Sequence, residues 1–287
     1  MGSTAMNRLA LSERDRAYLR DHTKFGLMNH VVAAEALRSA YQHAEGAAAT
    51  VRQLLERVDK ATAADMAGQL NDAARVQTIV VARLMSEYAA AIEDLAGMMV
   101  AVRDRRAGVM SRYFNSTISE TGAMLKELEG SDDLRELLGL PSVDDLRETL
   151  DDEALGALEH AYGAFAEHLH SIATAARMEG SAGVPVSPGD LEPDRLALIL
   201  GIGDAEATGP RGLLFQAHNK IKHRFMVIED IATVGATPGD PVRFGHLPRD
   251  QAMVVRLVDN IAQVALSAGE LAALMLMLDR AADAGAK

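Results

Sequence analysis

The eight prolines of this 287-residue chain all lie at or beyond position 141, and this distribution strongly limits what the first half can become. A proline inside a helix costs about 3 kcal/mol, because it removes a backbone donor and its ring clashes with the preceding turn. Alanine, the best helix former, is used heavily in the chain. The sequence therefore predicts that residues 1–140 run in long helices.

Apolar residues recur every three or four positions from about Lys24 to Val58, and again from Thr62 to Val102. This spacing is typical of helices that bury one face. The connection between the two segments is short, so we expect an antiparallel helical hairpin. Further helices are predicted to start at Ser12, to span about 108–128 and 152–178, to start after Asp133 and Ser142, and to span 249–283.

Two β-type runs, "RFMVIEDIATV" and "PVRFGH", follow His223 and are separated by the turn-rich "GATPGD". The expected fold class is all-α, an array of long antiparallel helices with a small late β-hairpin. Residues 1–11 are expected to be a disordered, tag-like N-terminus. Residues 12–287 are expected to form a single helical domain, whose best candidate for a sub-boundary is the Gly-, Ser- and Pro-containing loop at 180–190.

The chain has no cysteine, which excludes disulfides, zinc–thiolate sites, iron–sulfur clusters and cysteine nucleophiles. No apolar run of membrane-spanning length and no secretory signal is evident, so we expect a cytoplasmic protein without a membrane partner. Aromatic residues make up only 4% of the chain, which weakens any platform for stacking single-stranded nucleic acid. Alanine-rich helices often self-associate, and a homodimer is expected.

The net charge is −12, yet the cations gather in two places. Residues 100–112 hold one aspartate and four arginines, called here the arginine cluster: Arg103, Arg105, Arg106 and Arg112. Residues 209–224, called here the basic segment, hold four cations and no acid: Arg211, Lys220, Lys222 and Arg224. Two basic regions in an acidic chain favour a local anion site over general attraction to nucleic acid. Pairing of each region with acidic neighbours in the fold stays open as the structural alternative.

The end of the basic segment, "HNKIKH" at 218–223, combines groups that could perform chemistry. Asn219 and His223 are four residues apart and so share one side of a helix. Histidine is the usual general acid or base near neutral pH, and a lysine such as Lys222 stabilises charge on a phosphoryl oxygen. Cations also favour helix C-termini for dipole reasons alone. A structural role, an anion site and a catalytic site all remain open.

This hexapeptide resembles the RNxxxH motif of the HEPN superfamily, all-helical domains found in ribonuclease toxins, defence proteins and nucleotide-binding modules. Asn219 and His223 match the motif, while His218 stands where the family has arginine. The resemblance implies metal-independent RNA cleavage, usually across a dimer, with His223 as general acid/base and Asn219 orienting it. His218 would take the place of the arginine if it carries a proton.

The leading hypothesis is therefore a HEPN-like helical protein that uses no cofactor and has RNA or a nucleotide phosphate as its ligand. The anion contacts would be made by Lys220, Lys222, Arg224 and Arg211, joined by Arg103 and Arg106 if the two basic regions meet in space. The first alternative is a non-catalytic interaction or regulatory protein whose basic segment docks an acidic partner.

A second alternative is a metal-dependent, di-iron-type oxygenase. Glu167 and His170 form one E-x-x-H pair, the spacing that places both side chains on one face of a helix. Carboxylate-bridged di-iron bundles use two such pairs and two further glutamates, and no second pair is present in the sequence. The structural interpretation is a half-exposed polar face. His30 and His43 are expected to be ordinary surface or core-edge histidines.

Overall fold

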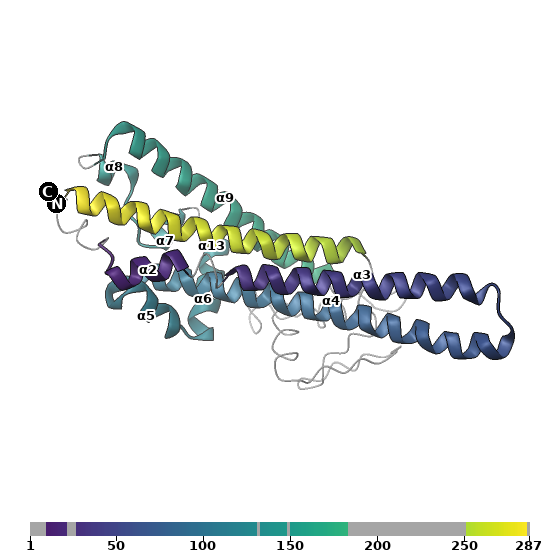
Figure 1. The fold of residues 1–287 in the computed structure, drawn as a ribbon. Coiled ribbons are helices and arrows are strands. Elements are labelled where there is room, and N and C mark those ends of the chain that lie inside the picture. The colour runs from purple at the N-terminus through teal and green to yellow at the C-terminus, as the bar shows by residue number, and fades with distance from the viewer. Residues whose placement is uncertain (1–9, 22–26, 131–132, 148–149, 183–250, 286–287) are drawn as a thin grey trace. The chain divides into compact units, whose positions relative to one another are not determined.

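The computed structural model describes residues 10–21, 27–130, 133–147, 150–182 and 251–285, and the regular elements in these ranges are all helical (Figure 1). The predicted all-α class is thus confirmed for the described residues, while the predicted late β-hairpin lies outside them. The helices are α2 (Glu13–Asp21), α3 (Leu27–Leu55), α4 (Lys60–Arg103), the 3₁₀ turn η2 (Arg105–Ala107), α5 (Val109–Phe114), α6 (Ile118–Gly130), α7 (Leu134–Leu137), α8 (Val143–Leu146), α9 (Asp152–Ala182) and α13 (Gln251–Gly285).

The chain divides into two compact units, each assembled from distant parts of the sequence. Unit 1 comprises residues 1–30, 91–175 and 262–287, and unit 2 comprises residues 31–90 and 176–261. The long helices α3, α4, α9 and α13 each contribute residues to both units. The domain limits expected from the sequence, at residue 12 and near 180–190, stay predictions.

In unit 2, α3 and α4 lie side by side and run in opposite directions (Figure 1). Only residues 56–59 connect the two helices, as the short linker in the sequence predicted. Two tyrosines anchor the core of this unit, since Tyr41 of α3 and Tyr88 of α4 are both completely buried. Leu84 and Met85 of α4 are equally inaccessible. The helical periodicity of the sequence correctly placed Tyr41 and Leu84 on buried faces, whereas Val76, predicted on the same face as Leu84, is 42% exposed.

The core of unit 1 is built around the last three turns of α4. All residues from Ala91 to Val102 are buried except Glu93 and Asp94. A helix that is apolar and buried on nearly all sides lies at the centre of its core. Small residues permit the close packing: a Cβ atom at Gly97 would lie 3.3 Å from the Tyr113 ring.

The predicted helix over 108–128 is wrong, because the chain breaks it into α5 and α6. Thr117 and Glu120 form a capping box at the break. The Thr117 Oγ1 accepts from the Glu120 backbone N–H at 3.3 Å, and a Glu120 carboxylate oxygen accepts from the Thr117 N–H at 2.7 Å. Such a box supplies partners for the donors exposed at a helix start. Because the capping box satisfies these donors, it favours the start of α6 here over a continuation of α5.

Two buried carboxylates attach α2 to distant parts of unit 1. Asp15 accepts a hydrogen bond from the backbone N–H of Met110 at 2.9 Å, at the start of α5. Asp279 of α13 accepts from the backbone N–H of Leu11 at 2.7 Å and from the Arg16 Nε at 2.6 Å. A buried carboxylate is tolerated only when such donors surround it. These contacts join the beginning and the end of the described chain.

The helix α13 is long and apolar enough to cross a membrane by length and composition. Within residues 251–283 its 18-residue window reaches a mean hydropathy of 1.8. The sequence had suggested no span because charged residues interrupt the apolar run. Of that window, 56% is buried inside the protein, and a core helix of a soluble protein passes the same test. The exposed side of α13 carries Arg256, Asp259, Gln263 and Arg280.

Candidate functional site

The residues expected to carry chemistry in the basic segment lie outside the described residues. They are His218, Asn219 and His223, together with Arg211, Lys220, Lys222 and Arg224. Their predicted roles stay predictions. The arginine cluster, in contrast, is described in full, so its possible role in binding an anion can be compared with its contacts.

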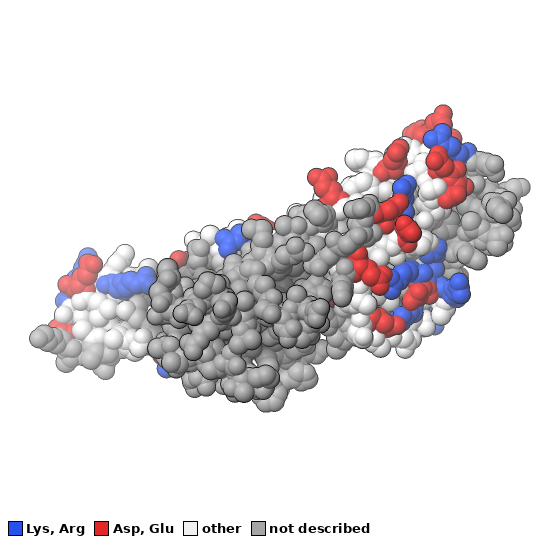
Figure 2. Space-filling view, turned by 180° about the vertical axis from the view of Figure 1, so that it is seen from behind, with Lys and Arg blue, Asp and Glu red and all other residues white. Residues whose placement is uncertain are grey.

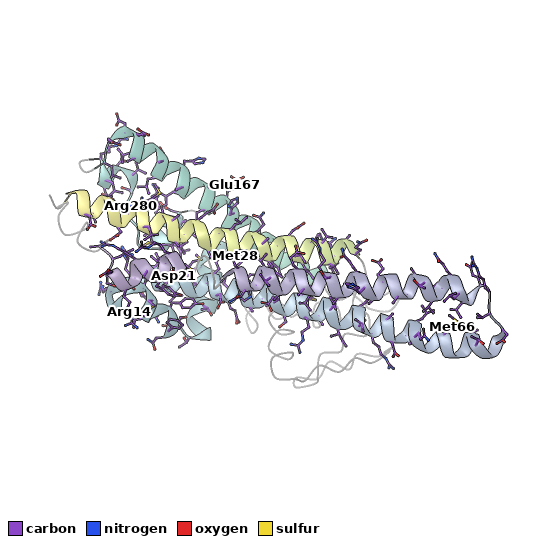
Figure 3. All side chains as sticks on the ribbon, in the orientation of Figure 1. Arg14, Asp21, Met28, Met66, Glu167 and Arg280 are labelled. Carbon is purple, nitrogen blue, oxygen red and sulfur yellow. The ribbon has the colours of Figure 1, made fainter. Side chains whose placement is uncertain are left out.

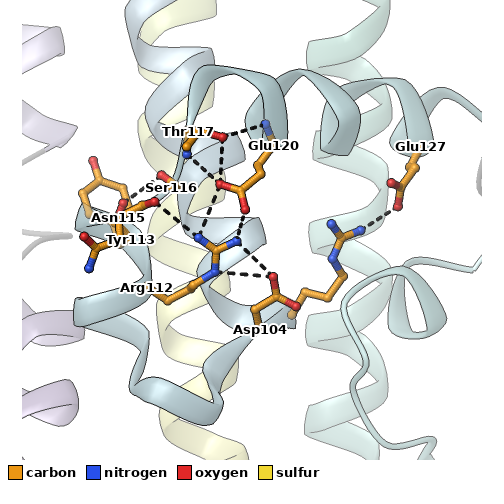
Figure 4. A network of polar contacts seen from close by, with 9 residues as sticks. Asp104, Arg112, Tyr113, Asn115, Ser116, Thr117, Glu120 and Glu127 are labelled. Carbon is orange, nitrogen blue, oxygen red and sulfur yellow. Dashed lines mark hydrogen bonds and ion pairs between the residues drawn. The ribbon is translucent and has the colours of Figure 1, made fainter.

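Carboxylates of unit 1 already engage two members of the arginine cluster (Figure 4). The Arg103 Nη1 lies 2.6 Å from an oxygen of Glu127 on α6. Arg112 binds Asp104 at 3.1 Å and also pairs with Glu120. Arg103 and Arg112 are therefore paired with acidic neighbours, which offset their charges within the fold.

The other two arginines of the cluster differ from each other. Arg105 donates to the backbone carbonyls of Val102 at 2.9 Å and Gly139 at 3.0 Å, so it fastens the end of α4 to the turn after α7. Arg106 is exposed, and its side chain has no hydrogen bond or ion pair with the described residues. Of the two arginines proposed as anion contacts, Arg106 is thus available and Arg103 is occupied.

Charge on the described surface is mixed. On the face that Figure 2 draws, acidic and basic side chains of the described residues lie interspersed. Neighbouring opposite charges reduce the field that an approaching polyanion experiences. On this face, therefore, the described residues form no uniformly basic patch.

Glu120 is the most strongly perturbed acid of this network. The hydrogen bond from Arg112, followed by the bonds from the Thr117 backbone and hydroxyl, lowers the pKa of Glu120 from 4.5 to about 2. A depressed pKa means that the charged carboxylate is favoured in the folded state. Its contribution to stability is complete above about pH 4.5 and is lost as the pH falls toward 2.

We expect the variant Glu120→Gln to lack this part of the acid sensitivity. The unfolding temperature of the wild type should fall more steeply than that of the variant between pH 4.5 and pH 2. Thermal unfolding followed by circular dichroism at low ionic strength measures this, because salt screens a pair so close to solvent. Glu56→Gln, at an exposed glutamate after α3, is the control and should follow the wild type. Parallel profiles for the wild type and Glu120→Gln would contradict the assignment.

A second polar cluster of unit 1 was not recognised in the sequence. It centres on Asp94 of α4, whose Oδ2 lies 2.9 Å from the Nε2 of His30 on α3. The hydroxyl of Tyr113 on α5 also bonds to Asp94. Burial, followed by the charge of Asp94, raises the pKa of both Tyr113 and Tyr18. His30 is therefore at the core edge, as expected, but it also has a specific carboxylate partner.

Aromatic rings cover one side of this Asp94 cluster. The Tyr18 ring of α2 lies 5.8 Å from that of Tyr113 and 6.0 Å from that of Phe114, measured between centroids. The Tyr113 and Phe114 rings are 5.4 Å apart and meet edge to face. Such contacts add to the burial of apolar area and fasten α2 to α5. Three of the chain's few aromatic residues thus meet here, and Tyr18 is far in the sequence from the adjacent pair Tyr113 and Phe114.

The described residues give the metal alternative no support. They contain no group of three or more His, Asp or Glu side chains placed to hold a metal ion. Glu167 is exposed on α9 (Figure 3), and the side chain of His170 lies outside the described residues. The histidine between them, His168, places its Nδ1 2.8 Å from Glu270 of α13. This pair links two helices of unit 1, which is a structural role.

Comparison with known proteins adds no assignment. No family model, no curated protein and no solved structure matches the chain.

Proposed function

We propose that this chain is a HEPN-like helical protein with a phosphate- or RNA-directed anion site in the basic segment, residues 209–224. The observation that carries the proposal is a contrast between the two basic regions. In the arginine cluster, Arg103 and Arg112 are bound to carboxylates of their own fold. The basic segment has four cations and no acidic residue within it. A group of cations with no acid among its sequence neighbours is the more suitable partner for a phosphate.

The all-α class of the described residues is compatible with this proposal, since the HEPN resemblance implies a helical domain. In the proposed site, His223 acts as general acid/base and Asn219 orients it, while Lys220, Lys222, Arg224 and Arg211 contact the anion. His218 takes the position of the family's arginine and can stabilise negative charge when protonated. Within the arginine cluster, Arg106 has no carboxylate partner among the described residues, whereas the guanidinium of Arg103 is occupied.

We expect purified protein to cleave members of a small RNA panel in the presence of a chelator, because the mechanism needs no metal. His223→Ala should reduce the cleavage rate by roughly a hundredfold or more, the usual contribution of a general acid or base. His160→Ala is the matched control, because His160 is exposed on α9 and lies outside the basic segment. Cleavage of equal rate by wild type and His223→Ala would overturn the catalytic role.

A charge-preserving variant separates catalysis from docking. His223→Lys keeps a cation but cannot exchange a proton near neutral pH. If the basic segment only docks an acidic partner, binding survives in this variant, and no RNA cleavage is seen with either protein. If RNA neither binds nor is cleaved by the wild type, the phosphate-directed proposal fails as a whole.

A further inference from the structure

The Asp94 carboxylate is shared by three neighbouring helices of unit 1. His30, from the first turn of α3, lies 2.9 Å from it, and Tyr113 of α5 donates its hydroxyl to it. Tyr18 of α2 packs on the Tyr113 ring and faces the same charge. The imidazole side chain is only 13% exposed, whereas the side chain of Asp94 is 42% exposed. A single carboxylate on α4 thus interacts with side chains from α2, from the first turn of α3 and from α5.

We propose that His30 and Asp94 form a proton-operated latch that holds the first turn of α3 on α4. When His30 carries its second proton, the contact is a charge-assisted hydrogen bond between imidazolium and carboxylate. When the proton leaves, the neutral imidazole still bonds to the carboxylate, but the attraction between opposite charges is lost. The ion pair is the stronger contact, because it adds this attraction to the hydrogen bond. The latch is therefore tight at mildly acidic pH and loosens as the pH rises through the titration range of the imidazole.

Among the described groups at this contact, His30 is the one that changes its protonation near neutral pH. Among the described residues, it is faced by Asp94 from α4, with Tyr113 from α5 and Tyr18 from α2 behind that carboxylate. On α3 itself, the described positions from 27 to 34 carry no other charged side chain. Imidazole is the side chain that ordinarily titrates between pH 5 and pH 8. Both phenols are displaced away from this range, since burial raises the pKa of each.

The direction of the pH dependence follows from the form of the imidazole that Asp94 stabilises. Asp94 favours the protonated imidazole in the folded state, while the unfolded chain offers it no such partner. The stabilisation is therefore present while His30 is protonated and disappears as the proton is lost at higher pH. Acid strengthens this contact, whereas acid weakens the contact of Glu120 with Arg112.

Hydrogen exchange of backbone amides tests the latch on the full-length protein. Protection factors correct for the intrinsic pH dependence of exchange, so they report the opening of the helix itself. For the amides of residues 31–34, in the second turn of α3, protection should fall roughly fivefold between pH 6 and pH 8.5, as the attraction between opposite charges is lost. In His30→Gln, which keeps a donor without the charge, this pH dependence should vanish.

Two further variants make the outcome decisive. Asp94→Asn should also abolish the pH dependence, and the double variant His30→Gln/Asp94→Asn should add little to either single change. His168→Gln is the control, since His168 has a carboxylate partner on α13 and should not affect α3. A flat profile for α3 in the wild type, or a profile unchanged in both His30→Gln and Asp94→Asn, would overturn the latch.

Discussion

Replacing Asp279 by alanine is expected to lower the free energy of unfolding by about 3 kcal/mol. The side chain of Asp279 is only 4% exposed and satisfies three donor contacts from two residues. Its removal leaves the Leu11 amide without its acceptor and takes two hydrogen bonds from the Arg16 guanidinium. On folding, a buried donor without a partner loses its hydrogen bond to water and gains none in return. Such a truncation therefore lowers the free energy of unfolding strongly.

Asp283 supplies the matched control for this experiment. It also binds Arg16, at 3.0 Å, but its side chain is 59% exposed. Exposed ion pairs contribute about 1 kcal/mol or less, so Asp283→Ala should unfold at nearly the denaturant concentration of the wild type. Urea unfolding followed by circular dichroism compares the two variants. Equal destabilisation by both would mean that burial of Asp279 does not determine its contribution.

Replacing Phe165 by alanine is expected to destabilise the fold by about 4 kcal/mol. Phe165 is completely buried in α9 and is among the largest side chains of the unit 1 core. The truncation removes the apolar area that the ring withdraws from water, and it leaves a cavity that neighbouring helices fill only in part. Reduced helix content at 37 °C would be an accompanying sign of this loss.

The same substitution at Phe114 separates burial from residue type. Phe114 is 69% exposed and contacts Tyr18 and Tyr113 along only part of its ring. Phe114→Ala should therefore cost about 1 kcal/mol or less. Denaturant unfolding of both variants under identical conditions measures the difference. A larger effect at Phe114 than at Phe165 would contradict the assignment of the core.

Local signals in the sequence were sufficient for most of the helices. Asp133 and Ser142 were expected to begin short helices, and both are N-caps: the Asp133 carboxylate accepts from the Arg135 N–H at 2.8 Å, and Ser142 forms a capping box with Asp145. A cap is readable because its partners lie within three residues. The break between α5 and α6 has the same signal, Thr117 followed by Glu120, but the apolar spacing across it concealed the break.

The polar clusters were not predictable, because their partners are far apart in the chain. Asp94 meets a histidine 64 residues away, and Asp279 meets Leu11 across 268 positions. Periodicity indicates which face of a helix is buried, but it does not indicate which helix covers that face. In the arginine cluster, composition suggested an excess of positive charge. Only the fold brings Glu127 to Arg103 and Glu120 to Arg112.

The three-segment composition of unit 1 has a consequence for how the protein is made. Its segments include both residues 1–30 and residues 262–287, so residues 31–261 are synthesised between these two segments. The hairpin of α3 and α4 depends on neighbouring residues and can form while translation continues. The acceptor of the Leu11 amide, Asp279, is translated 268 residues after Leu11 itself. The helix α2 must therefore wait, without its α13 partner, until α13 has been synthesised.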